Sequence, residues 1–262
     1  MQKAGLQKKA SELGLAIVAP DTSPRKTGIE GAEATWDFGT GAAIKKKKKK
    51  KHPLLKNKNK NIGAGFYLNA TKEPWNKYFK MYDYIVEELY ALLPQELPLD
   101  AAKVSIFGHS MGGLGALVIS LRNPDKFKSA SAFAPISHPS ACKIGQRAFA
   151  GYLGEDSKAP WKQYDPTELV QSYKSKDLHL LIDQGDLDAF YKDGTLLPND
   201  FLAAAQANNV SVQFNLQSGY GKSAFLILKK NFFSYVLSPD HGYYFVSTFI
   251  DSHLEHHSKY LA

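Results

Sequence analysis

The segment at 104–122 constrains the fold of this chain more than any other. A strand-like run at 104–107 leads into Gly-His-Ser-Met-Gly-Gly at 108–113, and an apolar helical pattern continues to Arg122. This order predicts a strand, a tight turn and a helix, with Ser110 held in a strained conformation at the turn. Glycines at 108 and 112 are expected because a side chain there would collide with the neighbouring strand or helix.

Strand-like and helical segments alternate along the rest of the chain. We predict strands at 15–19, 104–107, 130–134, 178–182 and 210–216, and helices at 75–92, 111–122, 199–207 and 245–260. Pro94 is expected to stop the first of these helices. The alternation predicts an α/β fold in one domain, 1–262, with a mostly parallel sheet covered by helices on both faces.

Composition narrows the class of protein. A chain of 262 residues that is 44% hydrophobic suits one sizeable α/β domain. The single cysteine, Cys142, excludes an internal disulfide and fits a reducing compartment. The first residues contain no apolar leader and no apolar run is long enough to cross a membrane, so we expect a cytoplasmic protein without a membrane partner. No cysteine and histidine cluster suggests a metal or cofactor, and we expect none.

The net charge of +8 comes from one tract. Residues 45–60 hold ten lysines, and without them 23 basic residues face 25 acidic ones. We therefore expect no nucleic-acid partner; the alternative is a non-catalytic basic protein acting through this tract, with salt-dependent binding. Two segments, 43–64 and 221–239, break the alternating pattern, and we interpret both as disordered or irregular inserts.

The turn at Ser110 predicts a nucleophile. A serine needs a base and an orienting acid, which in a fold of this kind follow in the order acid, then histidine. Asp183, Asp186 and Asp188 all follow the strand at 178–182, and His241 lies just before the last helix. The backbone N–H of Met111, at the start of a helix, is expected to stabilise an oxyanion.

The other histidines have plainer interpretations. His253, His256 and His257 lie on the predicted last helix, and we expect them to be solvated. His109 and His179 lie beside or within strands, where we expect structural roles.

Seven short segments together resemble the S-formylglutathione hydrolase family, also called esterase D. They are APDTSPR at 19–25, TWDFGTGA at 35–42, SIFGHSMGG at 105–113, SAFAPI at 131–136, LIDQGDLDAF at 181–190, LLPNDF at 196–201 and DHGYYF at 240–245. Their order and spacing are more specific than any single segment. The resemblance implies the α/β-hydrolase fold and a triad of Ser110, Asp188 and His241, because the family's acid is the third residue after the glycine that corresponds to Gly185.

The resemblance also implies an activity. A member of this family cleaves S-formylglutathione to formate and glutathione, a step in formaldehyde detoxification, without metal or cofactor. The expected partner is a small glutathione thioester, and a homodimer is one assembly that fits. The alternatives are a general short-chain carboxylesterase, whose triad would be the same, and an inactive fragment of the enzyme.

The chain departs from the family in two ways. Family members carry further residues upstream, with the first strands and a second oxyanion N–H, so we expect a sheet that lacks those strands. The segments 43–64 and 221–239 also interrupt family motifs. We interpret them as unspliced introns read as protein, since codons for Gly-Lys-Ser at 221–223 can contain a splice-donor-like string. Lineage-specific loops are the alternative.

Overall fold

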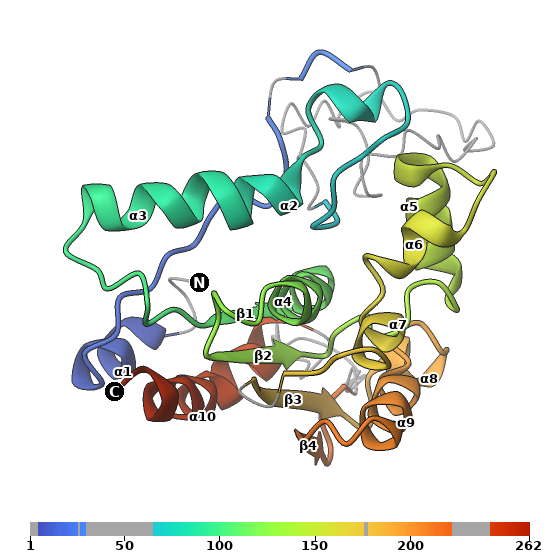
Figure 1. Cartoon of the computed structure of the whole chain (residues 1–262). Helices are drawn as coiled ribbons and strands as arrows, with labels where there is room; N and C mark the ends of the chain where they lie inside the picture. Colours follow the sequence, from blue (N-terminus) through green and yellow to red (C-terminus); the bar gives the residue numbers. More distant parts are fainter. Residues whose placement is uncertain (1–4, 26, 30–64, 176–177, 222–241) are drawn as a thin grey trace, which may run out of the picture.

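A four-stranded parallel sheet runs from the middle of the molecule to the lower edge of the view in Figure 1. The computed structural model describes residues 5–25, 27–29, 65–175, 178–221 and 242–262. Within them the strand order is β1-β2-β3-β4, with bounds β1 Ile106–His109, β2 Ser129–Phe133, β3 His179–Gly185 and β4 Val212–Gln217. The predicted parallel sheet is confirmed, as are four of its five predicted strands, with bounds shifted by one to three residues.

The strand predicted at 15–19 is wrong. These residues belong to no ladder, although Leu15 and Ile17 pack against the core. An apolar run makes a strand only where a neighbouring strand can pair with its backbone, and none of the described strands lies beside this run. The segments 43–64 and 222–239 lie outside the described residues.

Helices surround the sheet. Their bounds are α1 Leu6–Glu12, α2 Met81–Asp83, α3 Tyr90–Glu96, α4 Met111–Arg122, α5 Lys143–Leu153, α6 Ala159–Lys162, α7 Pro166–Val170, α8 Ala189–Lys192, α9 Pro198–Ala207 and α10 Tyr243–Leu261. The predicted helix at 75–92 is instead a 3-10 turn, Trp75–Lys77, then α2, a π-helical stretch, Tyr84–Leu89, and α3. Pro94 lies inside α3, which ends two residues later at Glu96, and the N–H of Leu97 still donates to the carbonyl of Leu93.

The helices cover both faces of the sheet, as predicted. On one face α4 packs against β1 and β2, with α7 and α9 beside it; on the other, α10 packs against β2 and β3. Neighbouring residues of β2 point to opposite faces. Ala130 and Ala132 join an apolar cluster with residues of α4, α7 and α9, whereas Ser129 and Ser131 bond to α10.

The prediction that His253, His256 and His257 are solvated is wrong. They are 0%, 6% and 3% exposed. The reason is that α10 presents these positions to the sheet, where serine hydroxyl groups of β2 bond to His253 and His257 and the carbonyl oxygen of His179 accepts from His256. His179 stacks on Tyr260 with ring centroids 3.7 Å apart, in keeping with a structural role.

Candidate active site

Ser110 stands in a strained turn between β1 and α4. Its φ of 58° and ψ of −114° lie where residues other than glycine are rare. Its N–H donates to the carbonyl of Phe133 at 2.9 Å, and its own carbonyl accepts from the N–H of Leu114 at 2.9 Å and of Ile136 at 3.4 Å. Such strain persists only where the surroundings hold it, and here β2 and the loop after it do so.

Glycines around Ser110 allow this close approach, though not all those predicted. A Cβ at Gly108 would lie 2.2 Å from the carbonyl oxygen of Gly112, so that requirement is confirmed. A Cβ at Gly112 would meet nothing within 4 Å, so the predicted collision there is wrong. The crowded position is Gly113, whose Cβ would lie 3.0 Å from Pro135, because one residue along the helix turns the side chain toward the loop after β2.

Met111 is the first residue of α4. The first N–H groups of a helix have no acceptor within it, and the helix dipole adds partial positive charge there. The backbone beside Ser110 therefore suits a developing negative charge. Among the described residues no group of three or more histidine, cysteine, aspartate or glutamate side chains could hold a metal ion.

Two of the three candidate acids, Asp183 and Asp186, form hydrogen bonds with β4 and with the turn after it. Asp183, in β3, is 1% exposed and accepts from the side-chain amides of Asn215 at 2.6 Å and Gln217 at 3.3 Å. Asp186 accepts from the backbone N–H of Gly219 at 2.9 Å and lies 3.3 Å from the Ser218 hydroxyl. Both carboxyl groups therefore tie β3 to β4 and the turn after it.

Asp188 is the third acid and lies just after β3. It is 2% exposed, caps α8 by accepting from the N–H of Phe190 at 2.8 Å, and has Gln184 Nε2 at 3.5 Å. The chain after β4 lies directly against it: a Cβ at Gly221 would come within 1.9 Å of the Asp188 nitrogen. Gly221 has a φ of 112°, which favours glycine. His241 lies outside the described residues, and the structure resumes at Gly242.

The loop after β2 joins the Ser110 turn to Leu196 and to α9, which the sequence reasoning missed. Besides the contact of Ile136 with Ser110, the N–H of Ser137 donates to the carbonyl of Leu196 at 2.7 Å. His138 Nδ1 lies 2.7 Å from Asp200 Oδ2 on α9. No periodic pattern marks these contacts, because they link loops far apart in the sequence.

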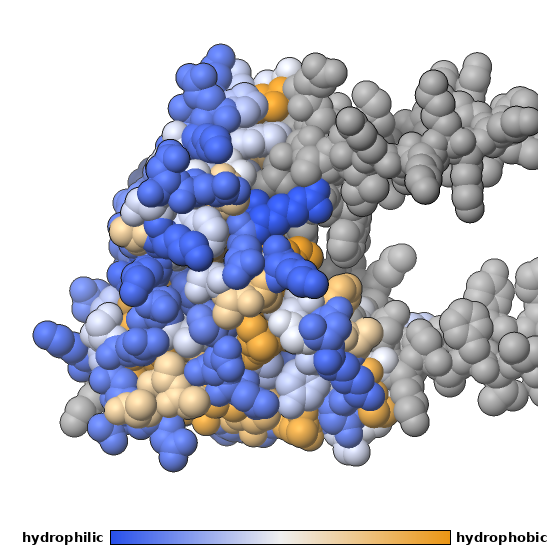
Figure 2. Space-filling view, turned by 90° about the vertical axis from the view of Figure 1, so that its right-hand side faces the viewer, coloured by the Kyte–Doolittle hydropathy of each residue, from blue (hydrophilic) through white to orange (hydrophobic). Residues whose placement is uncertain are grey.

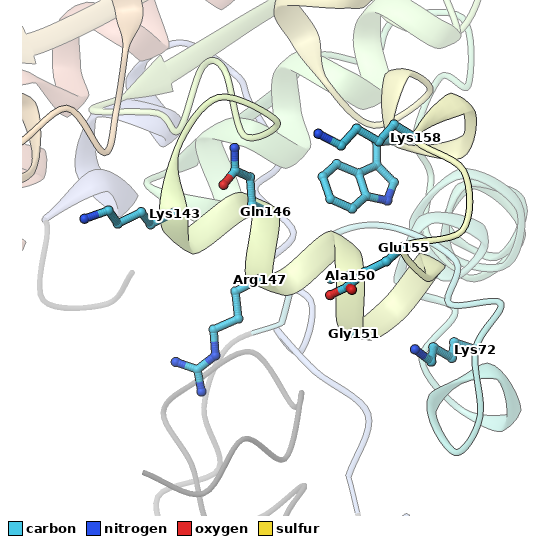
Figure 3. Close-up of a pocket in the computed structure, with 9 residues that line it drawn as sticks. Lys72, Lys143, Gln146, Arg147, Ala150, Gly151, Glu155 and Lys158 are labelled. Atoms are coloured by element: carbon cyan, nitrogen blue, oxygen red, sulfur yellow. The ribbon is translucent and has the colours of Figure 1, made fainter.

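A basic pocket of about 620 Å³ lies along α5 (Figure 3). Four cationic side chains and one acidic one, Glu155, line it, over the buried ring of Trp161. The cations are Lys72, Lys143, Arg147 and Lys158. Lys143 and Arg147 extend from the first half of α5, one helical turn apart. This spacing of two basic residues is the one sequence pattern that could have indicated the pocket. Hydrophilic side chains predominate on the right-hand side of Figure 1, which carries α5 (Figure 2).

Comparison with known proteins decides the family. The family model for putative esterases matches residues 53–255. S-formylglutathione hydrolases of Rattus norvegicus and Arabidopsis thaliana are each 45% identical; the matches cover 100% and 99% of this chain and 78% and 76% of those proteins. The chain belongs to the S-formylglutathione hydrolase family. The family expected from the sequence segments is thereby confirmed.

A solved structure supports the same S-formylglutathione hydrolase assignment. The enzyme from Agrobacterium tumefaciens superposes with a TM-score of 0.79 at 38% identity, over 100% of this chain and 79% of that one. A fluorophosphonate-binding serine hydrolase of Staphylococcus aureus, at 23% identity and a TM-score of 0.54, shares the fold. The chain therefore has the α/β-hydrolase fold and is a hydrolase of this family. None of its described helices is both long and apolar enough to span a bilayer.

Proposed function

We propose that this chain hydrolyses S-formylglutathione to formate and glutathione, with Ser110 as nucleophile, Asp188 as orienting acid and His241 as base. The observation that carries the proposal is the strained Ser110 turn between β1 and α4 in a chain of this family. Asp188 is the preferred acid because Asp183 and Asp186 already bind β4 and its turn.

The reaction follows from these groups. His241 removes the hydroxyl proton as Ser110 Oγ attacks the formyl carbon, and the backbone N–H of Met111 donates to the resulting oxyanion. The C–S bond then breaks, and the glutathione sulfur leaves with the proton from His241. Water, deprotonated by His241, attacks the formyl ester, and formate leaves as Ser110 regains its proton. Hydrolysis of this kind needs no electron carrier, which is why we propose no cofactor.

The basic pocket supports an anionic substrate over a neutral ester. Glutathione carries two carboxylates, and four cations line the pocket along α5. Helix α5 begins seven residues after Ile136, which bonds to Ser110. A neutral ester would gain no electrostatic attraction from these cations. A cytoplasmic location, a homodimer and the absence of a nucleic-acid partner stay predictions; the first rests on the single, free Cys142.

The triad is tested by comparing two neighbouring acids. We expect Ser110→Ala to lower kcat on the order of 10⁶-fold and Asp188→Asn on the order of 10⁴-fold, because the nucleophile and the tautomer of its base are lost. Rates of S-formylglutathione hydrolysis by the full chain measure this. The matched control is Asp186→Asn, which keeps far more activity. Full activity of Ser110→Ala, or greater damage from Asp186→Asn, would contradict the assignment.

The substrate class is tested by charge reversal. Lys143→Glu should raise KM for S-formylglutathione several-fold and leave KM for a short neutral acetyl ester unchanged, because only the former carries carboxylates. Lys8→Glu, on the exposed side of α1, is the control and should change neither. An equal effect on both substrates would favour the carboxylesterase alternative, and no activity at all in the parent chain would favour an inactive fragment.

A further inference from the structure

A chain of hydrogen-bonded side chains runs through the interface between α10 and the sheet. Ser105, just before β1, has its Oγ 2.7 Å from the Oγ of Ser129. Ser129 Oγ lies 2.8 Å from His257 Nδ1, and His257 Nε2 lies 2.8 Å from Ser131 Oγ. One imidazole of α10 thus sits between two hydroxyl groups of β2.

The chain continues to β3 and β4. Ser131 Oγ also lies 2.8 Å from His253 Nδ1. His253 Nε2 lies 3.5 Å from Asp183 Oδ2, an electrostatic contact without hydrogen-bond geometry. Asp183 in turn accepts from the amides of Asn215 and Gln217. The polar groups therefore extend from the residue before β1, through β2 and β3 beneath α10, to β4.

Burial restricts how these groups can share their protons. Ser129, Ser131 and His253 are 0% exposed, and His257 and Asp183 are 3% and 1% exposed. Water cannot complete a missing hydrogen bond at such depth, and an unpaired polar group there is costly. The hydroxyl and imidazole protons should therefore point toward the acceptors nearest to them, and His253 Nε2, which has no hydrogen-bond partner among the described residues, has the Asp183 carboxylate as its nearest charge.

The direction of the bonds follows from Asp183. A carboxylate carries no proton to donate, and its negative charge 3.5 Å away favours a proton on His253 Nε2, so we infer Nε2–H there. A neutral imidazole has one N–H, so His253 Nδ1 accepts from the hydroxyl of Ser131. Ser131 Oγ then accepts from His257 Nε2–H, and by the same logic His257 Nδ1 accepts from Ser129. With Ser105 donating to Ser129, every donor points toward Asp183.

The environment keeps both imidazoles neutral. Burial lowers the pKa of His257 to about 3, with His256 and His253 adding repulsion. Burial also lowers the pKa of His253, against the opposing pull of Asp183. A proton added to His257 would create a second N–H facing Ser129, whose hydroxyl would have to reverse. His179 on β3 and Lys259 on α10 are the other charged or titratable groups close by, acting on His256.

The hydrogen-bond chain lies beside the strands and loops that carry the proposed catalytic groups. Phe133, whose carbonyl accepts from Ser110, stacks on His253 with ring centroids 3.6 Å apart. The carbonyl of Asp183 accepts from the N–H of Ala134 at 2.8 Å. Asp188 lies five residues after Asp183 in the sequence. In the sequence, α10 begins two residues after His241.

We propose that Asp183, Ser131, His253 and His257 are positioning residues, whose one-way hydrogen-bond chain fixes α10 against the strands that carry the catalytic groups. The inference rests on the proposed function for its effect on catalysis, although the hydrogen-bond chain itself does not depend on it. The hydroxyl groups of Ser129 and Ser131 stabilise one tautomer of each histidine, and the charge of Asp183 determines the direction in which the hydrogen bonds point. Without the chain, α10 would keep its apolar contacts but lose its single register.

The first test is the tautomer of each histidine. Nitrogen-15 NMR of the full chain near neutral pH should show His253 and His257 both protonated at Nε2 and bare at Nδ1, with signals assigned from His253→Gln and His257→Gln variants. Protonation of Nδ1 in either residue would overturn the proposed direction. This readout does not involve activity, so it stands or fails separately from the proposed function.

The second test compares two serines of the same chain. Ser131→Ala leaves His257 Nε2–H and His253 Nδ1 without their hydrogen-bond partner. We expect kcat to fall on the order of 100-fold with KM within about twofold, because catalytic groups are displaced rather than removed. Ser105→Ala removes only the terminal donor and should keep kcat within about twofold. Equal kcat in the two variants, or a loss in Ser131→Ala that matches its unfolded fraction by circular dichroism, would overturn the positioning role. If Ser131→Ala does not fold, the tautomers decide.

Discussion

The two faces of the sheet are held to their helices in different ways. Toward α4, α7 and α9 the contacts are apolar: Leu117, Ile182 and Phe201 are all 0% exposed in one cluster with Ala130 and Ala132. Toward α10 the same strands present serine and aspartate, which contact two histidines. Adjacent residues of β2 thus belong to different interfaces: one is apolar, and the other adds buried hydrogen bonds to apolar contacts such as Phe133 on Phe245.

This difference separates stability from specificity. Apolar burial contributes about 25 cal/mol per Å² and has no direction, so helices on that face gain free energy in several registers. Buried hydrogen bonds contribute less on balance but fail unless every partner is in place. The apolar face therefore supplies stability at any pH, whereas the α10 face should fix one arrangement and respond to acid.

The largest expected effect comes from breaking the apolar face. Phe201→Ala should lower the free energy of unfolding by about 3–5 kcal/mol, because it removes a fully buried ring and leaves a cavity. Urea unfolding measures the change. The loss should be equal at neutral and mildly acidic pH, since no titratable group is removed; a strong pH dependence would contradict the division between the faces.

Acid should act on the α10 face. Below pH 6.5 the unfolded chain binds a proton at His257 that the folded chain binds only near pH 3, so stability falls as the pH falls through this window. At about pH 5 this amounts to roughly 2 kcal/mol. His257→Gln should lose correspondingly less stability between neutral pH and about pH 5. His253 and His256, whose pKa values burial also lowers, contribute to the remaining slope. An unchanged slope would show that His257 is not buried in its neutral form.

The smallest expected effect comes from placing a hydroxyl on the wrong side of β2. Ala132→Ser adds to the apolar cluster the group that Ser131 carries toward α10. We expect a loss of ~1 kcal/mol in the free energy of unfolding, because the new hydroxyl has no side-chain partner there. Thermal or urea unfolding would measure it. A gain in stability would mean that the two faces are less distinct than their side chains suggest.

The sequence by itself determined the elements whose cause is local. The glycine-flanked Ser110 turn is a matter of steric room over a few residues, and α4 begins and ends where its pattern predicted. The apolar run of β3 carries its strand preference within itself. The family followed from ordered segments, and Asp188 was chosen from three acids only through that resemblance.

Only the tertiary structure decided what is distant in the sequence. The periodicity of α10 did place His253 and His257 one turn apart and in line with Phe249, a signal that the sequence reasoning passed over. Their burial, however, depends on Ser129 and Ser131, more than 120 residues earlier. A histidine on a helix is polar in isolation, and it becomes a buried neutral link only where another element supplies a matching acceptor and donor. That pairing is a property of the packed sheet and helix, so no local pattern could have specified it.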